Sequence, residues 1–397
     1  MSARPLDGIV VLDLTRILAG PYATQKLGDM GATVWKVERP GAGDDTRGWG
    51  PPFHRGISTY FMAVNRSKRS VTLDLKHPRA DEVMTRLVRR ADVVVENFRP
   101  GTLEGLGWTW ERISAVNPRA IHASISGYGQ VGKHRDRPSY DVIAQGEWGA
   151  QHVTGDPDGP PMKFGLSIAD ITAGQHAVEG ILLALLQRER TGRGERVDVA
   201  LADGLLALLT YQAQMWLTGG VAPRRLGNAH PSIVPYQAFQ TRDGWLNVGV
   251  GSDALWARFC AVLGRDDLAA DPRWATNERR VTGRAELVPI IAAALRERDT
   301  AEWLARLEEA GVPAGPIRDV PAALGDAQGD LRGMVCTVEH PEAGPLAMVG
   351  NAVKLASVGM NPGYLPPPRL GEHTDQVLAA VGYSAGEVAD LRGAGVV

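Results

Sequence analysis

Residues 8–38 read GIVVLDLTRILAGPYATQKLGDMGATVWKVE, and they hold two short β-branched runs separated by a segment of helix length. The first run, GIVVLDL, ends at residue 14, and the second, ATVWKVE, covers residues 32–38. Two strands joined by one helix need a crossover connection, so they lie parallel in one sheet. The start of the chain therefore predicts a β-α-β unit. Asp13 interrupts the first apolar block, which argues against a secretory signal peptide.

The alternation of strand-like and helix-like segments continues through the first half of the chain. Strand-like runs recur at residues 70–75, 91–98 and 120–129, and an amphipathic segment at 78–91 has its apolar residues at helical spacing. Strands that alternate with helices of this length are typical of a doubly wound sheet. We therefore expect an α/β fold with a mostly parallel sheet.

The pattern changes after about residue 200. Residues 200–220 predict a buried helix, a Pro-rich link follows, and residues 236–251 predict a hairpin that turns at RDG. Helices rich in Ala and Leu come next, and strand-like segments return near the C-terminus. We expect a large Rossmann-like domain and a smaller α+β domain with these bounds: residues 1–200 and 330–397 for the large domain, 201–225 for a linker helix, and 226–329 for the small domain.

Composition excludes several classes of protein. The 397 residues carry a net charge of −2, with 44% hydrophobic and 22% charged residues, as in a soluble globular chain and unlike a disordered or strongly basic one. Cys260 and Cys336 form no disulfide framework or CxxC pattern, and the nine histidines form no metal-binding motif. The apolar run GILLALL at 180–186 is too short to span a membrane. We expect a cytoplasmic protein without metal, nucleic-acid or membrane partners.

A dinucleotide site is the first one to test in such a fold. The loop after the first strand carries Gly20, Gly28 and Gly31, but their spacing is not GxGxxG, so the usual backbone cradle for a pyrophosphate is missing. Glu38 ends the second strand, where NAD-binding folds place a ribose-binding acid, but without the glycines it is a weak indication. The sequence therefore disfavours NAD.

Two segments offer groups that suit the phosphates and base of a nucleotide-like ligand. The block NRSKRSVTLDLKHP at 65–78 carries several cations, which either lie in solvent or pair with phosphates. The segment ENFRPG at 96–101 ends a strand at the carboxyl edge of the predicted sheet, where doubly wound folds bind ligands. It supplies an amide, an aromatic ring and a cation in succession: Asn97, Phe98 and Arg99.

A third segment, FGLSIADITAG at 164–174, places Asp170 just ahead of an apolar-periodic helix. Asp170 is either a helix N-cap or a reactive carboxylate that attacks a thioester to form a mixed anhydride. The helix dipole is expected to keep this carboxylate ionised. Gly174 and Gly180 lower helix propensity, which indicates close approach of a backbone or ligand, or simply tight packing.

These blocks together resemble a known family. VERPG, NRSKRS, ADVVVENFRPG, SISGYGQ, SIADITAG and LGEHT occur in the order and spacing of the class III CoA-transferases, the CaiB/BaiF family, and the resemblance covers nearly the whole chain. Within that family, RGWGPPF at 47–53, AHPSIVPYQAF at 229–239 and the C-terminal AGVV are most similar to succinate–hydroxymethylglutarate (glutarate) CoA-transferases.

The resemblance implies an activity and an assembly. The fold would be a Rossmann-like large domain plus a small domain, with two chains interlocked as a homodimer. The enzyme would be an acyl-CoA:carboxylate CoA-transferase that uses CoA esters as substrates, with no tightly bound cofactor. CoA would move from a donor such as succinyl-CoA to a dicarboxylic acid such as glutarate. Asp170 would be the nucleophile, passing through an aspartyl anhydride and an aspartyl-CoA thioester.

The resemblance also implies binding residues, carried over position by position. The CoA-binding candidates are Ile17, Leu18, Arg39, Leu73, Leu75, Lys76, Asn97, Phe98, Arg99, Tyr140 and Asp141. The basic block then becomes a phosphate clamp. A dicarboxylate acceptor needs a cation for its distal carboxylate, and the candidates around the acyl group are Arg47, His54, Arg55, His230, Gly249 and Gly251, each of which is otherwise an ordinary surface or interface position.

Departures from the family pattern bear on the substrate and the reaction. Gly105 stands where many members have Arg or Lys, which removes one phosphate contact, and VGVGSD at 248–253 replaces the GGGGQ loop of formyl-CoA:oxalate transferases. α-Methylacyl-CoA racemases of the same fold use a His/Asp pair, and their His position falls at Tyr140, a poor base near neutrality. A racemase-like enzyme and a non-catalytic acyl-CoA-binding protein remain the alternatives.

Overall fold

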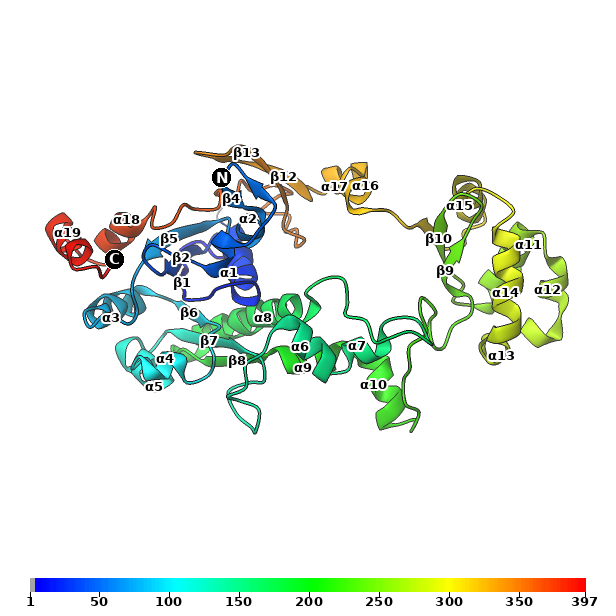
Figure 1. Ribbon diagram of the computed structural model, residues 1–397, viewed down its shortest axis with the longest axis horizontal. Helices are drawn as coiled ribbons and strands as arrows, with labels where there is room; N and C mark the ends of the chain where they lie inside the picture. Colours follow the sequence, from blue (N-terminus) through cyan, green and yellow to red (C-terminus); the bar gives the residue numbers. More distant parts are fainter. Residues whose placement is uncertain (1–3) are drawn as a thin grey trace. The chain divides into compact units, whose positions relative to one another are not determined.

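The computed structural model describes residues 4–397, which form two compact units (Figure 1). Unit 1 contains the chain up to Ala150, together with Phe164–Gln214 and Asp326–Val397. Unit 2 contains Gln151–Lys163 and Met215–Gly325. The blue N-terminal and red C-terminal segments of Figure 1 thus belong to the same unit.

Unit 1 is built on a six-stranded sheet in the order β5-β2-β1-β6-β7-β8, and every pair of neighbouring strands is parallel. The expected α/β fold is confirmed. Its strands are β1 (Val10–Asp13), β2 (Thr33–Glu38), β5 (Lys68–Thr72), β6 (Val93–Glu96), β7 (Ile121–Ser126) and β8 (Arg196–Ala200). The chain winds outward from β1 on one side and from β6 on the other, so the loops after these two strands part and leave a crevice at the carboxyl edge.

Alternate strand residues bury two apolar faces. Val10 and Leu12 of β1 point to one core, which includes α3 (Ala80–Arg90), α5 (Trp110–Val116), α18 (Thr374–Ala380) and α19 (Ala385–Gly393). Val11 points to the other, which includes α1 (Ala19–Asp29), α6 (Asp141–Glu147), α8 (Ile168–Thr191) and α9 (Leu201–Leu208). This period-2 alternation is what the continuous apolar runs of a doubly covered parallel sheet require.

Smaller elements surround the sheet of unit 1. The turn η1 (Asp45–Gly48), the hairpin β3 (Phe53–His54) and β4 (Ile57–Ser58), and α2 (Thr59–Val64) lie between β2 and β5 in the chain. The short α4 (Thr102–Gly105) follows β6, and α7 (Ala150–Val153) follows α6. A second hairpin, β12 (Val335–His340) and β13 (Gly344–Val349), packs on Met62 of α2 after the short α17 (Ala327–Leu331).

Unit 2 carries a three-stranded antiparallel sheet, β11-β10-β9. The predicted hairpin is confirmed, because β9 (Tyr236–Gln240) and β10 (Trp245–Gly249) pair antiparallel across a turn that Thr241 N closes on Gly244 O at 2.9 Å. A separate apolar core packs this sheet against helices. The remaining elements are α11 (Asp253–Leu263), α12 (Asp266–Ala270), η2 (Pro272–Trp274), α13 (Asn277–Thr282), α14 (Arg284–Leu295), α15 (Thr300–Glu309), β11 (Ala314–Pro316) and α16 (Val320–Leu324).

The prediction of one buried helix over 200–220 is wrong. The segment forms two helices, α9 and α10 (Thr210–Leu217), and the backbone breaks between them, where Thr210 has a φ of 38°. Leu206 and Leu208 of α9 are exposed in this chain. None of the helices between residues 4 and 397 has the length and apolarity needed to cross a bilayer.

Candidate functional site

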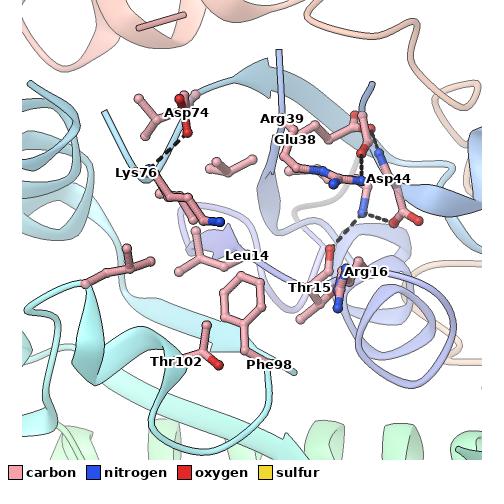
Figure 2. Close-up of a pocket in the computed structure, with 16 residues that line it drawn as sticks. Leu14, Thr15, Arg16, Glu38, Arg39, Asp44, Asp74, Lys76, Phe98 and Thr102 are labelled. Carbon is pink, nitrogen blue, oxygen red and sulfur yellow. Dashed lines mark hydrogen bonds and ion pairs between the residues drawn. The ribbon is translucent and has the colours of Figure 1, made fainter. Parts of the chain in front are cut away.

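Two neighbouring cavities of unit 1 open at the carboxyl edge of the sheet. The first has a volume of about 230 Å³ and lies over the ends of β1, β2 and β5 (Figure 2). Figure 2 shows Phe98 and Thr102 on one side of it and Glu38, Arg39 and Asp44 on another. The second has a volume of about 270 Å³ and reaches Asp170. Arg16 and Phe98 line both cavities, so an extended ligand can pass from one to the other.

Asp170 lies in the first turn of α8 and lines the second cavity. Within residues 4–397, no group donates a hydrogen bond to its side-chain oxygens. The cap of α8 comes instead from Asp141, whose Oδ1 accepts the backbone N–H groups of Ala169 at 2.9 Å and Asp170 at 3.4 Å. The N-cap interpretation of Asp170 is therefore wrong, because another carboxylate already occupies that place.

The protonation of Asp170 also differs from the expectation. Burial, and next to it the negative charge of Asp141, raises the pKa of Asp170 to about 7. The helix dipole favours the anion, but desolvation and a like charge outweigh it here. The expectation that Asp170 stays fully ionised is therefore wrong for the substrate-free site. A poised carboxyl group that titrates near neutrality in a cavity is typical of reactive positions.

Both glycines of α8 mark close contacts between elements. A Cβ on Gly174 would lie 2.7 Å from the carbonyl oxygen of Ala19, at the start of α1. A Cβ on Gly180 would lie 2.5 Å from a Val197 methyl group on β8. The predicted close approach of a backbone is thus confirmed at Gly174, where it brings the start of α1 beside the turn that carries Asp170.

The structure brings most of the predicted CoA-binding residues together. Those that line the first cavity are Arg39, Leu73, Leu75, Lys76 and Phe98, and those that line the second are Ile17, Leu18, Asn97, Phe98, Arg99 and Tyr140. Asp141 is not among the residues that line either cavity, because its oxygens cap α8 and accept a bond from Gln145 Nε2 at 2.7 Å. Asp141 therefore shapes the site from behind Asp170.

Two of the basic residues expected in a phosphate clamp point inward. Arg66 is buried and pairs with Asp29 of α1 at 2.7 Å, and Lys68 is buried against Asp13 at 3.1 Å. Neither lies in solvent, and neither faces the cavities, because their carboxylate partners hold them under the sheet edge. Of this block, Lys76 lines the first cavity. The expectation of a clamp made by the whole block is therefore wrong for Arg66 and Lys68.

The carboxylate of Glu38 is also bound by other side chains of the protein. Arg47 Nε and Nη2 donate to its two carboxylate oxygens at 2.7 Å each, and Ser70 Oγ donates at 2.6 Å. The Arg47 guanidinium in turn lies over the ring of Phe61 at 3.8 Å. An arginine held in this way has little freedom to meet the distal carboxylate of an acceptor, so the structure weighs against that role for Arg47.

The other acceptor candidates lie in two places. His54 and Arg55 are exposed on the β3–β4 hairpin of unit 1, and Arg55 occupies its turn with a φ of 48°. His230 belongs to unit 2, where its ring packs 5.3 Å from that of Tyr236. Gly249 also faces the Tyr236 ring, and a Cβ on Gly251 would meet nothing within 4 Å.

Sequence reasoning missed Arg16 as a residue of the site. Arg16 lines both cavities and shares the Asp45 carboxylate with Arg39, at 3.0 and 2.5 Å. Its place directly after the first strand could have indicated this. Tyr60 of α2 has a pKa raised to about 12, by burial first and then by the negative charges of Asp170, Asp141 and Asp44, so its phenol stays protonated. No sequence pattern pointed to Tyr60.

Known proteins are similar to this chain over most of its length. A sequence profile described as CoA-transferase family III matches residues 6–374. The succinyl-CoA:glutarate CoA-transferase of Mus musculus is 44% identical over 397 residues, which cover 100% of this chain and 91% of the relative. The acetyl-CoA:oxalate CoA-transferase of Acetobacter aceti is 41% identical over 353 residues, 89% of each chain. A crystal structure of a CaiB/BaiF family protein from Brucella suis aligns with a TM-score of 0.84 at 39% identity, covering 96% of this chain and 100% of that one.

Proposed function

Because this chain belongs to CoA-transferase family III and is an enzyme that transfers CoA, we propose that it moves CoA from succinyl-CoA to glutarate through a covalent intermediate on Asp170. The observation that carries the covalent route is the carboxyl group of Asp170, which opens into the second cavity with no hydrogen bond from residues 4–397 to its oxygens. The mouse relative supports the choice of acids, and the Acetobacter relative shows why the choice needs a test.

The reaction begins with attack of the Asp170 carboxylate on the thioester carbonyl. The C–S bond breaks, and CoA leaves as the thiolate with the electron pair, which gives an acyl-aspartyl anhydride. The thiolate then attacks the Asp170 carbonyl carbon, and the donor acid leaves as its carboxylate, which gives an aspartyl-CoA thioester. The acceptor carboxylate repeats both steps in reverse and leaves as its CoA ester. Asp170 returns as a carboxylate, so no net proton is consumed.

The two cavities suggest how the CoA ester binds. The nucleotide end occupies the first cavity, where Phe98 stacks and Arg16, Arg39 and Lys76 meet the phosphates. The pantetheine arm passes Phe98 and Arg16 into the second cavity, beside Ile17, Leu18 and Asn97, and brings the thioester to Asp170.

The enzyme also acts as a homodimer in this proposal. Helix α8 exposes Leu182, Leu183 and Leu186 among polar residues such as Glu179 and Gln187, and Leu206 and Leu208 of the contacting α9 are exposed too. A cluster of exposed leucines is typical of a surface that another protein covers. A second copy of the chain is the cover that the family resemblance implies, and the large and small domains predicted from the sequence are the parts that interlock.

The proposed location is the cytoplasm. Cys260 and Cys336 are both buried free thiols, which suits a reducing compartment. Fractionation of source cells followed by immunoblotting tests this, and recovery of the enzyme in a membrane or secreted fraction contradicts it.

The decisive experiment incubates the enzyme with succinyl-CoA and a panel of acids and separates the CoA esters formed. We expect glutaryl-CoA to form fastest, with oxalate and monocarboxylates slower by at least about tenfold, a difference that one misplaced carboxylate can produce. Faster transfer to oxalate or to a monocarboxylate overturns the choice of acceptor. Deuterium exchange at the α-carbon of a 2-methylacyl-CoA without CoA transfer would instead indicate the racemase-like alternative.

A second experiment tests the covalent route independently of the acceptor. Hydroxylamine added together with succinyl-CoA, but not alone, is expected to inactivate the enzyme and convert Asp170 to the hydroxamate, visible by peptide mass spectrometry. CoA transfer without any adduct at Asp170 contradicts the intermediate.

A further inference from the structure

The loop between β1 and α1 contains a backbone conformation that is costly for its residue. Ile17 has a φ of 71°, in the left-handed region. This region is rare for any residue with a Cβ, and a β-branched side chain makes it a genuine outlier. Such conformations persist where surrounding contacts enforce them, and they cluster at functional sites. The question is what holds Ile17 and what the conformation provides.

Asp44 holds the loop from the β2 side. Both of its carboxylate oxygens accept the Ile17 N–H at 3.3 Å. Lys36, which is fully buried, donates to Asp44 Oδ2 at 2.8 Å and to the carbonyl oxygen of Thr15 at 3.0 Å. Figure 2 shows Thr15, Arg16 and Asp44 gathered at this corner of the first cavity. The same buried ion pair thus binds the backbone on both sides of Arg16.

Asn97 holds the loop from the β6 side. Its Oδ1 accepts the backbone N–H of Arg16 at 2.9 Å, and its Nδ2 donates to the carbonyl oxygen of Arg16 at 2.7 Å. The amide therefore uses its acceptor and one of its two donors on a single peptide residue across the crevice between β1 and β6. This geometry indicates that the main role of Asn97 is to hold the loop, and that any direct contact with CoA is secondary.

The loop forms one wall of the cavity that contains Asp170. Ile17 and Leu18 line this cavity. The following residues cannot shift freely, because a Cβ on Gly20 would lie 2.3 Å from Thr15 Cβ, and Ala19 O abuts Gly174 on α8. A change of φ at Ile17 would therefore move the wall relative to the turn that carries Asp170.

We propose that Asn97 and Asp44 are positioning residues that hold Ile17 in its left-handed conformation and so keep the wall beside Asp170 in the shape that receives the acyl-CoA. The kinetic part of this inference rests on the proposed function. The structural part, that the two side chains compensate the strain at residue 17, stands on the contacts alone.

A double-mutant cycle separates strain from direct contact with the ligand. Asn97→Ala removes both bonds to Arg16 from a half-buried residue, so the fold is expected to survive. Ile17→Gly and Ile17→Ala both remove the branched side chain, but Gly adopts a positive φ without cost whereas Ala does not. If Asn97 compensates the strain at residue 17, then Asn97→Ala reduces CoA binding and activity when residue 17 is Ile or Ala. The same substitution has little effect when residue 17 is Gly.

The expected results follow from that comparison. Asn97→Ala weakens CoA binding, measured by calorimetry, and lowers kcat/KM about tenfold with Ile at residue 17 and severalfold with Ala. With Gly the further loss is within about twofold. An equal loss in all three backgrounds overturns the proposal, since it would show that Asn97 contacts CoA directly or only supports the fold.

Amide hydrogen exchange of the peptide that covers residues 14–22 gives a readout independent of activity. Exchange of the Arg16 and Ile17 amides is expected to accelerate in Asn97→Ala and to return toward the parent rate when Ile17→Gly is added. Unchanged exchange in Asn97→Ala also overturns the proposal. If the parent enzyme transfers no CoA, the proposed function fails, while the exchange and CoA-binding patterns still decide whether the loop is held in this way.

Discussion

At the level of single residues, the site depends on two neighbouring aspartates with different tasks. The carboxylate oxygens of Asp141 accept hydrogen bonds from the backbone at the start of α8 and from the side chain of Gln145. Asp170 receives no such bond from residues 4–397, and burial together with the charge of Asp141 raises its pKa to about 7. Two neighbouring carboxyl groups whose environments differ in this way commonly have separate roles.

The raised pKa predicts an acid limb in the rate of the first half-reaction. The attacking group must be ionised, so below pH 7 the rate is expected to fall about tenfold for each pH unit. Asp141→Asn removes the like charge but keeps an acceptor for Ala169 N–H, so the midpoint is expected to move to lower pH. Release of CoA thiolate in single turnovers across about pH 5 to 9 measures both profiles. A midpoint that does not move in the variant contradicts the coupling.

Replacement of the nucleophile gives the second prediction. Asp170→Asn keeps the shape of the side chain but cannot form the anhydride, so acyl exchange is expected to fall at least about 10³-fold while CoA affinity stays within about twofold. Chromatography of CoA esters and calorimetry with CoA measure the two quantities. Asp170→Ala serves as the matched variant, and full activity in either one would end the proposed mechanism.

The same substitution has a predictable effect on stability. The folded state holds the Asp170 proton more tightly than the unfolded chain, because the pKa rises from 3.8 to about 7. Burying the charge therefore costs nothing below pH 3.8 and its full amount above pH 7. Asp170→Asn is expected to stabilise the protein by about 1–2 kcal/mol at pH 8 and to leave it unchanged at pH 4. Urea unfolding at both pH values tests the sign.

At the level of elements, the contact between α1 and α8 fixes where Asp170 lies. Gly174 leaves room for the Ala19 carbonyl one turn beyond Asp170, so the two helices approach more closely than any side chain would allow. The sequence signalled this contact through a glycine in an otherwise good helix. It could not signal whether a ligand or a backbone filled the space, because that depends on how α1 is placed.

A methyl group at Gly174 gives a prediction at this scale. Gly174→Ala places Cβ 2.7 Å from Ala19 O, and because both partners are backbone, the helices must separate. We expect a loss of about 1–3 kcal/mol in the free energy of unfolding and a larger fall in activity than in CoA affinity. Gly386→Ala on α19, where a Cβ meets nothing within 4 Å, is the matched control and is expected to be neutral or slightly stabilising. Equal effects of the two changes would contradict the account.

At the level of the whole molecule, the outer side of α8 and α9 gives the last prediction. Leu183→Arg replaces a side chain that is 60% exposed in one chain, so folding of that chain is expected to change by less than about 0.5 kcal/mol. The proposed dimer is expected to dissociate, as seen by light scattering after size exclusion. Val131→Arg, at a loop residue that is 79% exposed, is the control. A parent protein that is monomeric at working concentration contradicts the dimer outright.

Three segments show how much of the structure could be predicted from the sequence. The alternation in residues 8–129 gave the parallel sheet, since strand and helix periods are local properties of the chain. The prediction of one buried helix over 200–220 was wrong, because an apolar segment does not itself show whether its own chain or another molecule covers it. The position of Asp170 was correctly expected at a helix start, but its freedom from capping depended on Asp141, which comes from a separate helix.

The sequence by itself determined the α/β class, and it indicated the sheet edge proposed to receive the ligand and the residue proposed to react, because these follow from periodicity and motif order along the chain. Only the tertiary structure decided which charged residues line the cavities. Arg66 and Lys68 turn inward because Asp29 and Asp13 lie beneath them. Arg16 stays half exposed at the cavities, with its own backbone bound by Asn97 and the Ile17 N–H bound by Asp44. Such pairings join residues far apart in the chain, so no local pattern records them.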